Sequence, residues 1–197
     1  MKLWSYFFTF FIAMSCSHFI EAKESAKKNE VAIFAAGCFW GVEEFFRKTP
    51  GVIETKVGYS GGKTNNPTYR DVSQGITGHA ESVEVQFDPQ LVSLEQLLDL
   101  FFKMHDPTTR NAQGNDRGTQ YRSAVFYSNE QQKKRVENFI AKVEKSGAWK
   151  NKLTTEVTKA GPFYVAEEEH QKYLVKNKGG YDNHYKRDLN FDVLKPK

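Results

Sequence analysis

Apolar positions recur with the period of a strand in some segments of the chain and with the period of a helix in others. A period of two, or a short apolar run, predicts strands at residues 31–36, 52–59, 80–87, 123–127 and 153–159. Apolar side chains at helical spacing predict helices at residues 38–48, from Ser93 onward, and at 129–146. Ser93 followed by Gln96 is a capping-box signature for the start of the middle helix. Strands separated by helices indicate a two-layer domain of the α+β or α/β class.

Long connecting segments separate some of these elements. Residues 60–78 are rich in turn-forming residues and too long for a simple connector, which favours a functional loop. A second turn-rich loop is predicted at residues 106–118. From residue 161 onward the pattern is irregular and polar, with a small amphipathic piece around His170. We therefore expect long loops and an irregular C-terminal tail.

The first residues have the pattern of an export signal. Met1 and Lys2 give a short positive start, and residues 3–14 form an uncharged apolar run. This run is too short for a stable membrane-spanning helix but suits the core of a signal peptide. Ala22 is a small residue at a plausible cleavage position.

These features suggest a division of the chain. We expect a signal peptide at residues 1–22, a polar linker at 23–30 and a single catalytic domain at 31–197. Two alternatives stay open, namely a lipoprotein signal over residues 1–15 with lipid on Cys16, and an uncleaved anchor. In each case the protein is exported, and is periplasmic, secreted or attached to a membrane.

Composition narrows the chemistry. The net charge of +4 comes from 28 basic and 24 acidic residues, mixed along the chain without a long basic block, which gives no support to a nucleic-acid interface. Aromatic residues make up 14%, which indicates an aromatic-rich core or pocket. Loss of Cys16 with the signal leaves Cys38 alone, so that neither an internal disulfide nor a cysteine-based metal cluster can form.

Cys38 lies where a predicted strand ends and a helix begins, within residues 37–41 (Gly-Cys-Phe-Trp-Gly). A helix N-terminus stabilises a thiolate, so we expect a lowered pKa for this thiol. The flanking glycines permit a sharp turn and close approach of a substrate, and Phe39 and Trp40 would stand beside the sulfur. The alternative is an inert cysteine buried in a well-packed turn.

Glu81 shares one face of a predicted strand with apolar residues. Because side chains alternate along a strand, Glu81 lies on the same face as Val83, Val85 and Phe87. If it points inward, its pKa is raised and it can act as a general acid near neutral pH. The pattern leaves equally open that Glu81 turns back to water at the strand end.

Other polar residues give weaker signals. Tyr69, Asp116 and Tyr121 lie in or beside the turn-rich loops, where their side chains could bind an oxygen or orient a neighbour, or be merely structural. The histidines at 79, 105, 170 and 184 match no compact set of metal ligands, so no metal site is predicted. His170 is expected at the surface or behind the site.

Together these motifs resemble the A-type peptide methionine-S-sulfoxide reductases. The resemblance extends over residues 31–181, and several separate motifs occur in the expected order. These are residues 37–41, 58–62 (Gly-Tyr-Ser-Gly-Gly), 66–69 (Asn-Pro-Thr-Tyr), 78–81 (Gly-His-Ala-Glu), 105–107 (His-Asp-Pro), 114–116 (Gly-Asn-Asp) and 121–123 (Tyr-Arg-Ser).

The resemblance implies a fold and an activity. The fold is an α+β two-layer sandwich with a ferredoxin-like β-α-β core. The implied activity is thiol-dependent reduction of methionine (S)-S-oxide, protein-bound and free, through a sulfenic acid. Such an enzyme would repair oxidised proteins, bind no cofactor and act as a monomer.

The resemblance also implies residue roles. Cys38 would attack the sulfoxide sulfur, Glu81 would protonate its oxygen, and Tyr69 and Tyr121 would hydrogen-bond to that oxygen. The remaining roles concern binding: Phe39 and Trp40 would form the apolar wall for the methyl group, and Asp116 would fix the substrate backbone or the pocket.

The tail departs from a common family pattern. Many members carry resolving cysteines in a Gly-rich tail, whereas residues 179–185 here contain none. We therefore expect an external thiol, from thioredoxin, glutaredoxin or a small molecule, to reduce the Cys38 sulfenic acid. Two competing hypotheses are a one-cysteine peroxidase and an exported sensing or adhesive domain in which Cys38 is structural.

Overall fold

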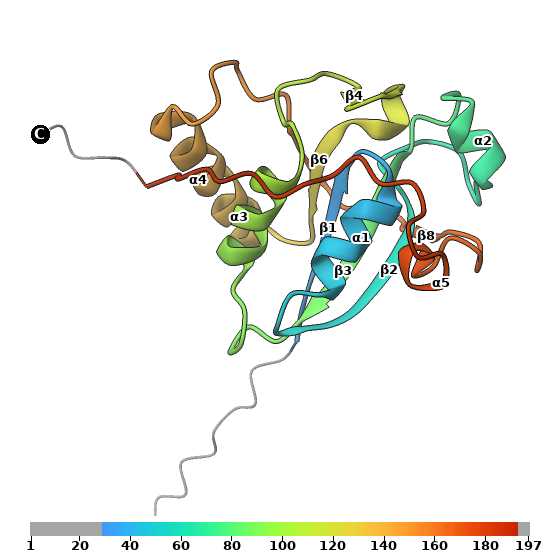
Figure 1. Ribbon diagram of the computed structural model, residues 1–197, viewed down its shortest axis with the longest axis horizontal. Helices are drawn as coiled ribbons and strands as arrows, with labels where there is room; N and C mark the ends of the chain where they lie inside the picture. The colour runs from blue at the N-terminus through green and yellow to red at the C-terminus, as the bar shows by residue number, and fades with distance from the viewer. Residues whose placement is uncertain (1–28, 193–197) are drawn as a thin grey trace, which may run out of the picture.

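A six-stranded mixed sheet forms the centre of the computed structural model, which describes residues 29–192 (Figure 1). The strand order is β7-β6-β1-β3-β2-β8, and neighbours are antiparallel except for β6 and β7. The strands are β1 (Glu30–Ala36), β2 (Val52–Ser60), β3 (Ala80–Phe87), β6 (Ser123–Tyr127), β7 (Glu156–Lys159) and β8 (Tyr164–Val165).

Helices cover one face of this sheet, so the domain has two layers (Figure 1). The helices are α1 (Phe39–Arg47), α2 (Tyr69–Ser73), α3 (Leu94–Met104), α4 (Glu130–Ser146) and α5 (Tyr173–Lys176), with a 3₁₀ turn at Thr119–Tyr121. A small hairpin pairs β4 (Ala112–Gln113) with β5 (Asp116–Arg117). The α+β class, with two layers and long loops, is thereby confirmed.

The core follows from the two periods in the sequence. Alternate residues of β1 and β3 face the helices, and Phe34, Val83 and Val85 are fully buried there. Helix α3 starts at the Ser93 capping box, and its apolar stripe is fully buried. That stripe consists of Leu94, Leu97, Leu98, Phe101 and Phe102.

The topology positions the site. Strand β3 lies between β1 and β2, so α1 crosses over a strand that runs opposite to both. Because β3 is antiparallel to β1, the turn that leaves β1 and enters α1 lies beside the start of β3. Cys38 and Glu81, which are 43 positions apart, are thus brought to the same end of the sheet.

Several loops and strand boundaries differ from those expected from the sequence. The loop over residues 60–78 contains α2, and the loop over 106–118 contains the β4–β5 hairpin. Strand β7 begins at Glu156 and is shorter than the predicted 153–159. Glu30, expected in the linker, is the first residue of β1. The predicted signal peptide and residues 23–28 of the linker lie outside the described residues.

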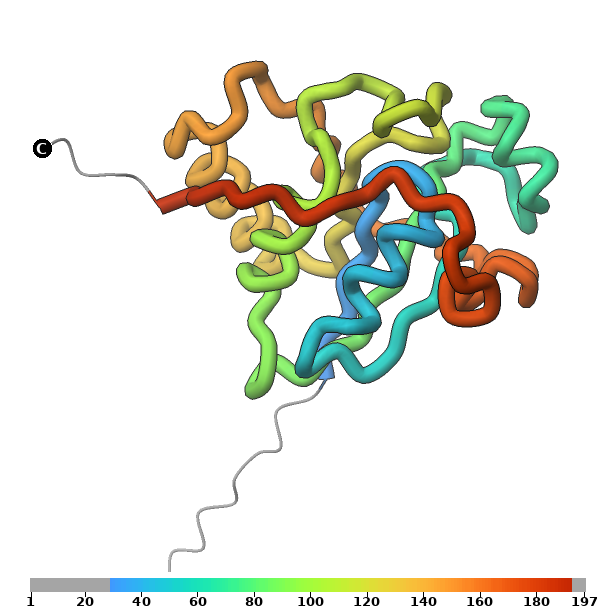
Figure 2. The backbone as a smooth tube through the Cα atoms, viewed as in Figure 1, coloured from blue at the N-terminus to red at the C-terminus, as the bar shows by residue number. Residues whose placement is uncertain are grey.

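The C-terminal segment runs as an irregular strap across the helical face (Figure 2). Its backbone is attached to α3 where the Arg187 N–H donates to the Lys103 carbonyl, at 2.9 Å. Further along, Phe191 is buried against Phe139 of α4. Within residues 29–192, no helix has both the length and the apolar character that crossing a bilayer requires.

Candidate active site

Cys38 occupies the N-cap position of α1, directly after a turn at Gly37. Gly37 adopts φ +96°, a backbone conformation that residues with a side chain rarely reach, which accounts for the glycine before the cysteine. Cys38 is 7% exposed, so its sulfur has little access to bulk water.

The expected lowering of the Cys38 pKa is wrong for the enzyme without substrate. Burial raises the pKa of the thiol well above its ordinary value, and the negative charge of Glu81 raises it further. The backbone N–H of Trp40 lowers it, as a helix start should, but does not outweigh burial. The resting cysteine is therefore a thiol.

Glu81 points inward from β3, and the alternative that it turns back to water is wrong. Its side chain is 1% exposed, and one carboxyl oxygen, Oε2, accepts a hydrogen bond of 3.0 Å from the Phe39 N–H. Burial raises the pKa of Glu81 to about 8, opposed by the Phe39 hydrogen bond and aided by Asp116. Glu81 therefore carries a proton at neutral pH, next to the first turn of the cysteine helix.

Two tyrosines complete the polar side of the site. Tyr69 begins α2 and Tyr121 ends the 3₁₀ turn, and neither hydroxyl has a hydrogen-bond partner among the described residues. Burial and then the charge of Glu81 raise the pKa of both phenols, that of Tyr69 to about 12. Cys38 also contributes to both shifts, so the groups lie close together. Glu81 and two hydroxyl donors thus lie near one sulfur.

The apolar side of the site is aromatic. Phe39 is buried, and its ring lies against Tyr69, with centroids 6.4 Å apart. Trp40 stacks on Tyr173, with centroids 3.7 Å apart, and its indole N–H donates to His170 Nδ1 at 3.1 Å. His170 is buried rather than at the surface, and it supports the site from behind.

Asp116 also lies at the site, held by the tail. Tyr181 donates its hydroxyl to Asp116 Oδ1 at 2.8 Å, and Asn183 donates its amide to Oδ2 at 2.8 Å. The charge of Asp116 raises the pKa of Cys38 and of Glu81. All seven residues expected from the sequence are therefore gathered at one end of the sheet.

Sequence reasoning missed Glu167, which holds two of the aromatic residues. One carboxylate oxygen accepts the Tyr69 N–H at 2.8 Å, and the other accepts the Tyr59 hydroxyl at 2.7 Å. The run of glutamates at residues 167–169 gives no local signal that one of them turns inward.

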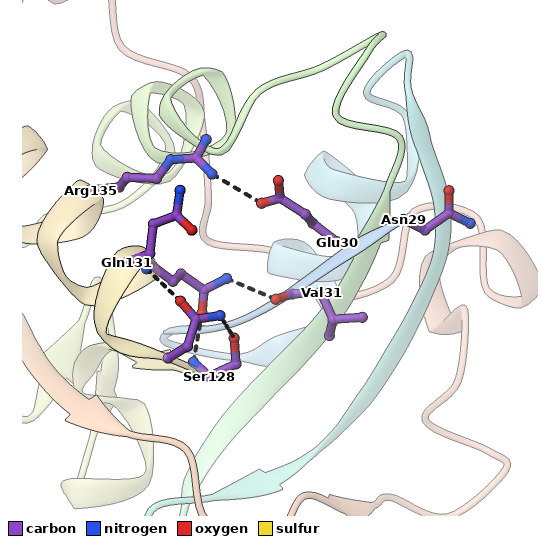
Figure 3. A pocket seen from close by; sticks show the side chains of 8 residues that line it. Asn29, Glu30, Val31, Ser128, Gln131 and Arg135 are labelled. Atoms are coloured by element: carbon purple, nitrogen blue, oxygen red, sulfur yellow. Dashed lines mark hydrogen bonds and ion pairs between the residues drawn. The ribbon is translucent and has the colours of Figure 1, made fainter. Parts of the chain in front are cut away.

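A cavity of about 470 Å³ opens at the opposite end of β1, beside Glu30, Val31 and Arg135 (Figure 3). Arg135 donates to Glu30 at 3.0 Å, and the Gln132 amide donates to the Val31 carbonyl at 2.9 Å. Most of the polar side chains there bind one another, and no cysteine lines the cavity. In residues 29–192 no cluster of three or more His, Cys, Asp or Glu could hold a metal ion.

Comparison with known proteins agrees with this arrangement. Residues 30–195 match the model of the family described as peptide methionine sulfoxide reductase. A curated relative, peptide methionine sulfoxide reductase MsrA 1 of Mesorhizobium japonicum, is 51% identical over 162 residues, which cover 82% of this chain and 92% of that protein.

Solved structures show the same likeness. Reduced Mxr1 of Saccharomyces cerevisiae superposes with a TM-score of 0.77 at 38% identity, covering 82% of this chain and 93% of that one. Mxr1 solved in complex with Trx2 superposes with a TM-score of 0.56 at 28% identity, covering 82% of this chain and 91% of that one.

Proposed function

Since the chain belongs to the peptide methionine sulfoxide reductase family and reduces methionine sulfoxide in a thiol-dependent reaction, we propose that Cys38 is its nucleophile and Glu81 its proton donor. The observation that supports this most is the buried carboxyl of Glu81, with its raised pKa, beside Cys38. A sulfoxide oxygen leaves sulfur readily only when it is protonated, and a neutral carboxylic acid supplies that proton.

The proposed step transfers one oxygen atom. Glu81 protonates the sulfoxide oxygen while Tyr69 and Tyr121 donate hydrogen bonds to it, and the Cys38 sulfur attacks the sulfoxide sulfur. The S–O bond of the substrate breaks, the oxygen ends on Cys38 as a sulfenic acid, and Glu81 regains a proton from the thiol. The sum is thiol plus sulfoxide to sulfenic acid plus methionine, which balances in atoms and electrons.

The protonation of Glu81 also helps Cys38 to ionise. The charged carboxylate of Glu81 raises the pKa of the thiol, whereas the neutral acid does not. A pKa of about 8 keeps Glu81 uncharged at neutral pH, so the thiolate forms without a neighbouring negative charge. One proton on Glu81 thus serves both the leaving oxygen and the nucleophile.

The aromatic wall suits the methyl group of the substrate. Phe39 and Trp40 present apolar rings, and the stack on Tyr173 keeps the indole in one orientation. A fixed methyl pocket opposite a fixed oxygen site accepts one configuration at sulfur, which we assign as S. Asp116 orients the substrate backbone, and both free and protein-bound methionine sulfoxide are substrates.

An external thiol restores the enzyme. Residues 179–185 contain no cysteine, so a donor thiol attacks the Cys38 sulfenic acid, releases water and forms a mixed disulfide. A second donor thiol then releases Cys38. The solved complex of Mxr1 with Trx2 supports thioredoxin as the donor, ahead of glutaredoxin or a small thiol. Turnover with each donor, measured at equal thiol concentration, ranks them.

One assay separates this function from its competitors. Methionine sulfoxide with dithiothreitol should yield methionine with the wild-type enzyme and none with Cys38→Ser. Consumption of peroxide without formation of methionine would indicate a peroxidase instead. Inertness toward both substrates would leave Cys38 a structural residue.

The cellular place of the enzyme is a separate part of the proposal. The pattern of residues 1–22 supports export, after which the protein is released or stays attached to a membrane. The proposal also has the domain acting as a monomer. The mass of the mature N-terminus distinguishes a cut after Ala22 from lipid on Cys16 or an uncleaved anchor. An intact N-terminus on a protein found in the cytoplasm would contradict export.

A further inference from the structure

Glu43 is a buried acidic residue of α1 that the proposed reaction does not use. It is 1% exposed, and each of its carboxyl oxygens accepts a hydrogen bond. Oε1 accepts from the Thr55 hydroxyl of β2 at 3.0 Å, and Oε2 accepts from the backbone N–H of Lys172 at 2.7 Å. This one side chain thus joins α1 to the central sheet and to the start of α5.

Helix α5 has few means of its own to hold its place. It is a single turn, Tyr173–Lys176, with no buried residue in it, and the side chain of its N-cap residue Lys172 does not cap it. So short a helix is not stable by itself, because fixing the backbone yields too few hydrogen bonds. Lys172 also adopts φ +53°, a left-handed conformation that is uncommon for a residue with a side chain. The bond between the Lys172 N–H and the buried Glu43 therefore fixes where the turn begins.

The segment that enters α5 supports the aromatic wall of the site. Tyr173 lies flat against the Trp40 indole, with centroids 3.7 Å apart and an angle of 11° between the rings. His170 accepts the indole N–H at 3.1 Å, and its ring centroid lies 5.4 Å from that of Phe39. Residues 170–173 thus contact both rings of the wall, and their position decides how much room the wall leaves.

A second attachment holds the residue just before Lys172. The Gln171 amide accepts the Val57 N–H at 3.0 Å and donates to the Val57 carbonyl at 2.9 Å, both on β2. This attachment does not involve Glu43, so the segment stays on the sheet when Glu43 is changed. Loss of the Glu43 bond then frees Lys172 and the turn that follows, and Tyr173 is the first side chain of that turn.

We propose that Glu43 is a positioning residue for the methyl pocket, which it keeps narrow by holding Tyr173 against Trp40. An acceptor at Oε2 is sufficient for this, whether or not the carboxyl is ionised. A narrow pocket distinguishes a methyl from an ethyl group on the sulfoxide sulfur, because one methylene in an apolar pocket changes kcat/KM by about tenfold or more. This inference rests on the proposed role of Phe39 and Trp40 as the wall that receives the methyl group.

The test compares the (S)-sulfoxide of methionine with that of ethionine, which carries an ethyl group on sulfur. The ratio of their kcat/KM values, measured with dithiothreitol, should exceed about tenfold for the wild-type enzyme. Glu43→Met removes the acceptor at a similar side-chain length. It should lower this ratio about fivefold, mainly by raising KM for methionine sulfoxide.

Three further variants separate the pocket from stability. Thr55→Val removes the other hydrogen bond of the same carboxyl, so it should lower the melting temperature and leave the ratio at the wild-type value. Glu43→Gln keeps an acceptor for the Lys172 N–H and should retain most of the wild-type ratio. In a Tyr173→Ala background, Glu43→Met should not lower the ratio further, because the side chain through which Glu43 acts is absent.

One measurement on the wild-type protein does not depend on the folding of any variant. Amide hydrogen exchange followed by NMR should show stronger protection of the Lys172 N–H than of the Lys178 N–H, although both residues are exposed. Equal exchange rates would overturn the bond to Glu43 as the anchor of this segment.

Failure of this inference differs from failure of the proposed function. An unchanged ratio in a folded Glu43→Met, or an equal fall in Thr55→Val, overturns the role of Glu43 while the wild-type enzyme still forms methionine. A wild-type enzyme that does not distinguish the two sulfoxides overturns the methyl pocket, and the role of Glu43 with it. Activity that survives Cys38→Ser overturns the proposed nucleophile instead.

Discussion

The two ends of strand β1 differ in how far their polar groups are paired. At the Glu30 end, Arg135 binds Glu30 and Glu95, and Gln132 binds the backbone at Val31 and Ser128 (Figure 3). This end has a cavity of about 470 Å³, yet most of the polar side chains that line it already have a partner.

At the Cys38 end, two hydroxyl donors are left without a partner among the described residues. The hydroxyls of Tyr69 and Tyr121 have no partner among the described residues, and Glu81 uses one oxygen for the Phe39 N–H. The two half-exposed hydroxyls are thus available to a bound oxygen, next to a buried carboxyl and a thiol, and this combination of groups distinguishes the Cys38 end.

Glu81→Gln should give the largest difference between the two ends. Glutamine keeps the shape and can accept the Phe39 N–H, but it cannot protonate the departing oxygen. We expect kcat/KM for methionine sulfoxide to fall by about 10²–10⁴, measured as methionine formed with dithiothreitol. Near wild-type activity would remove Glu81 from the mechanism.

The dependence on pH should show the same carboxyl. Glu81 must be protonated, so kcat/KM should fall about tenfold per unit as pH rises above about 8. Since the folded pKa lies above the ordinary value of 4.5, folding favours the protonated form. Stability should then decrease as pH rises from about 4.5 to about 8 and level off above.

Glu81→Gln provides the control for both curves. Thermal unfolding of this variant should lack the decrease between these pH values, because no proton is bound on folding. A wild-type melting temperature that does not change over this window would contradict the raised pKa.

Tyr69→Phe and Tyr121→Phe should have smaller effects. Each removes one hydrogen bond to the oxygen, and we expect about a tenfold loss in kcat, or about 1.4 kcal/mol, with little change in melting temperature. Because both hydroxyls serve the same atom, the double variant should deviate from the product of the single losses. If the loss in the double variant equals the product of the two single losses, one of the hydroxyls does not bind the sulfoxide oxygen.

Arg135→Met should have the smallest effect on activity. It removes the ion pairs with Glu30 and Glu95 and should lower the free energy of unfolding by about 1 kcal/mol. Steady-state kinetics should not change, since this end faces no reacting group. A drop in kcat comparable to that of the tyrosine variants would break the contrast between the two ends.

The sequence predicted the fold where local patterns decide it. The period of two placed Glu81 on the buried face of β3, and the Ser93–Gln96 pair located the start of α3. The lowered pKa expected for Cys38 was wrong because the helix start is a local feature, whereas burial depends on the whole fold.

The parts that could not be predicted come from distant segments. Three side chains that support the site follow their partners by more than 90 residues. They are Glu167, which binds the Tyr69 N–H, Tyr173, which stacks on Trp40, and His184, which lies against the Ala36 carbonyl. No spacing in the sequence links them to their partners. Gly41 was taken as a turn residue, but in the structure a Cβ at this position would overlap the Asp182 carboxylate and His184 Nδ1.

A single turnover without reductant tests the central claim most directly. The reduced enzyme is mixed with excess methionine sulfoxide, and both the methionine formed and the mass of the Cys38 peptide, trapped with dimedone, are measured. We predict one methionine per enzyme and dimedone bound at Cys38 in equal amount. Methionine formed while Cys38 stays an unmodified thiol would contradict the account.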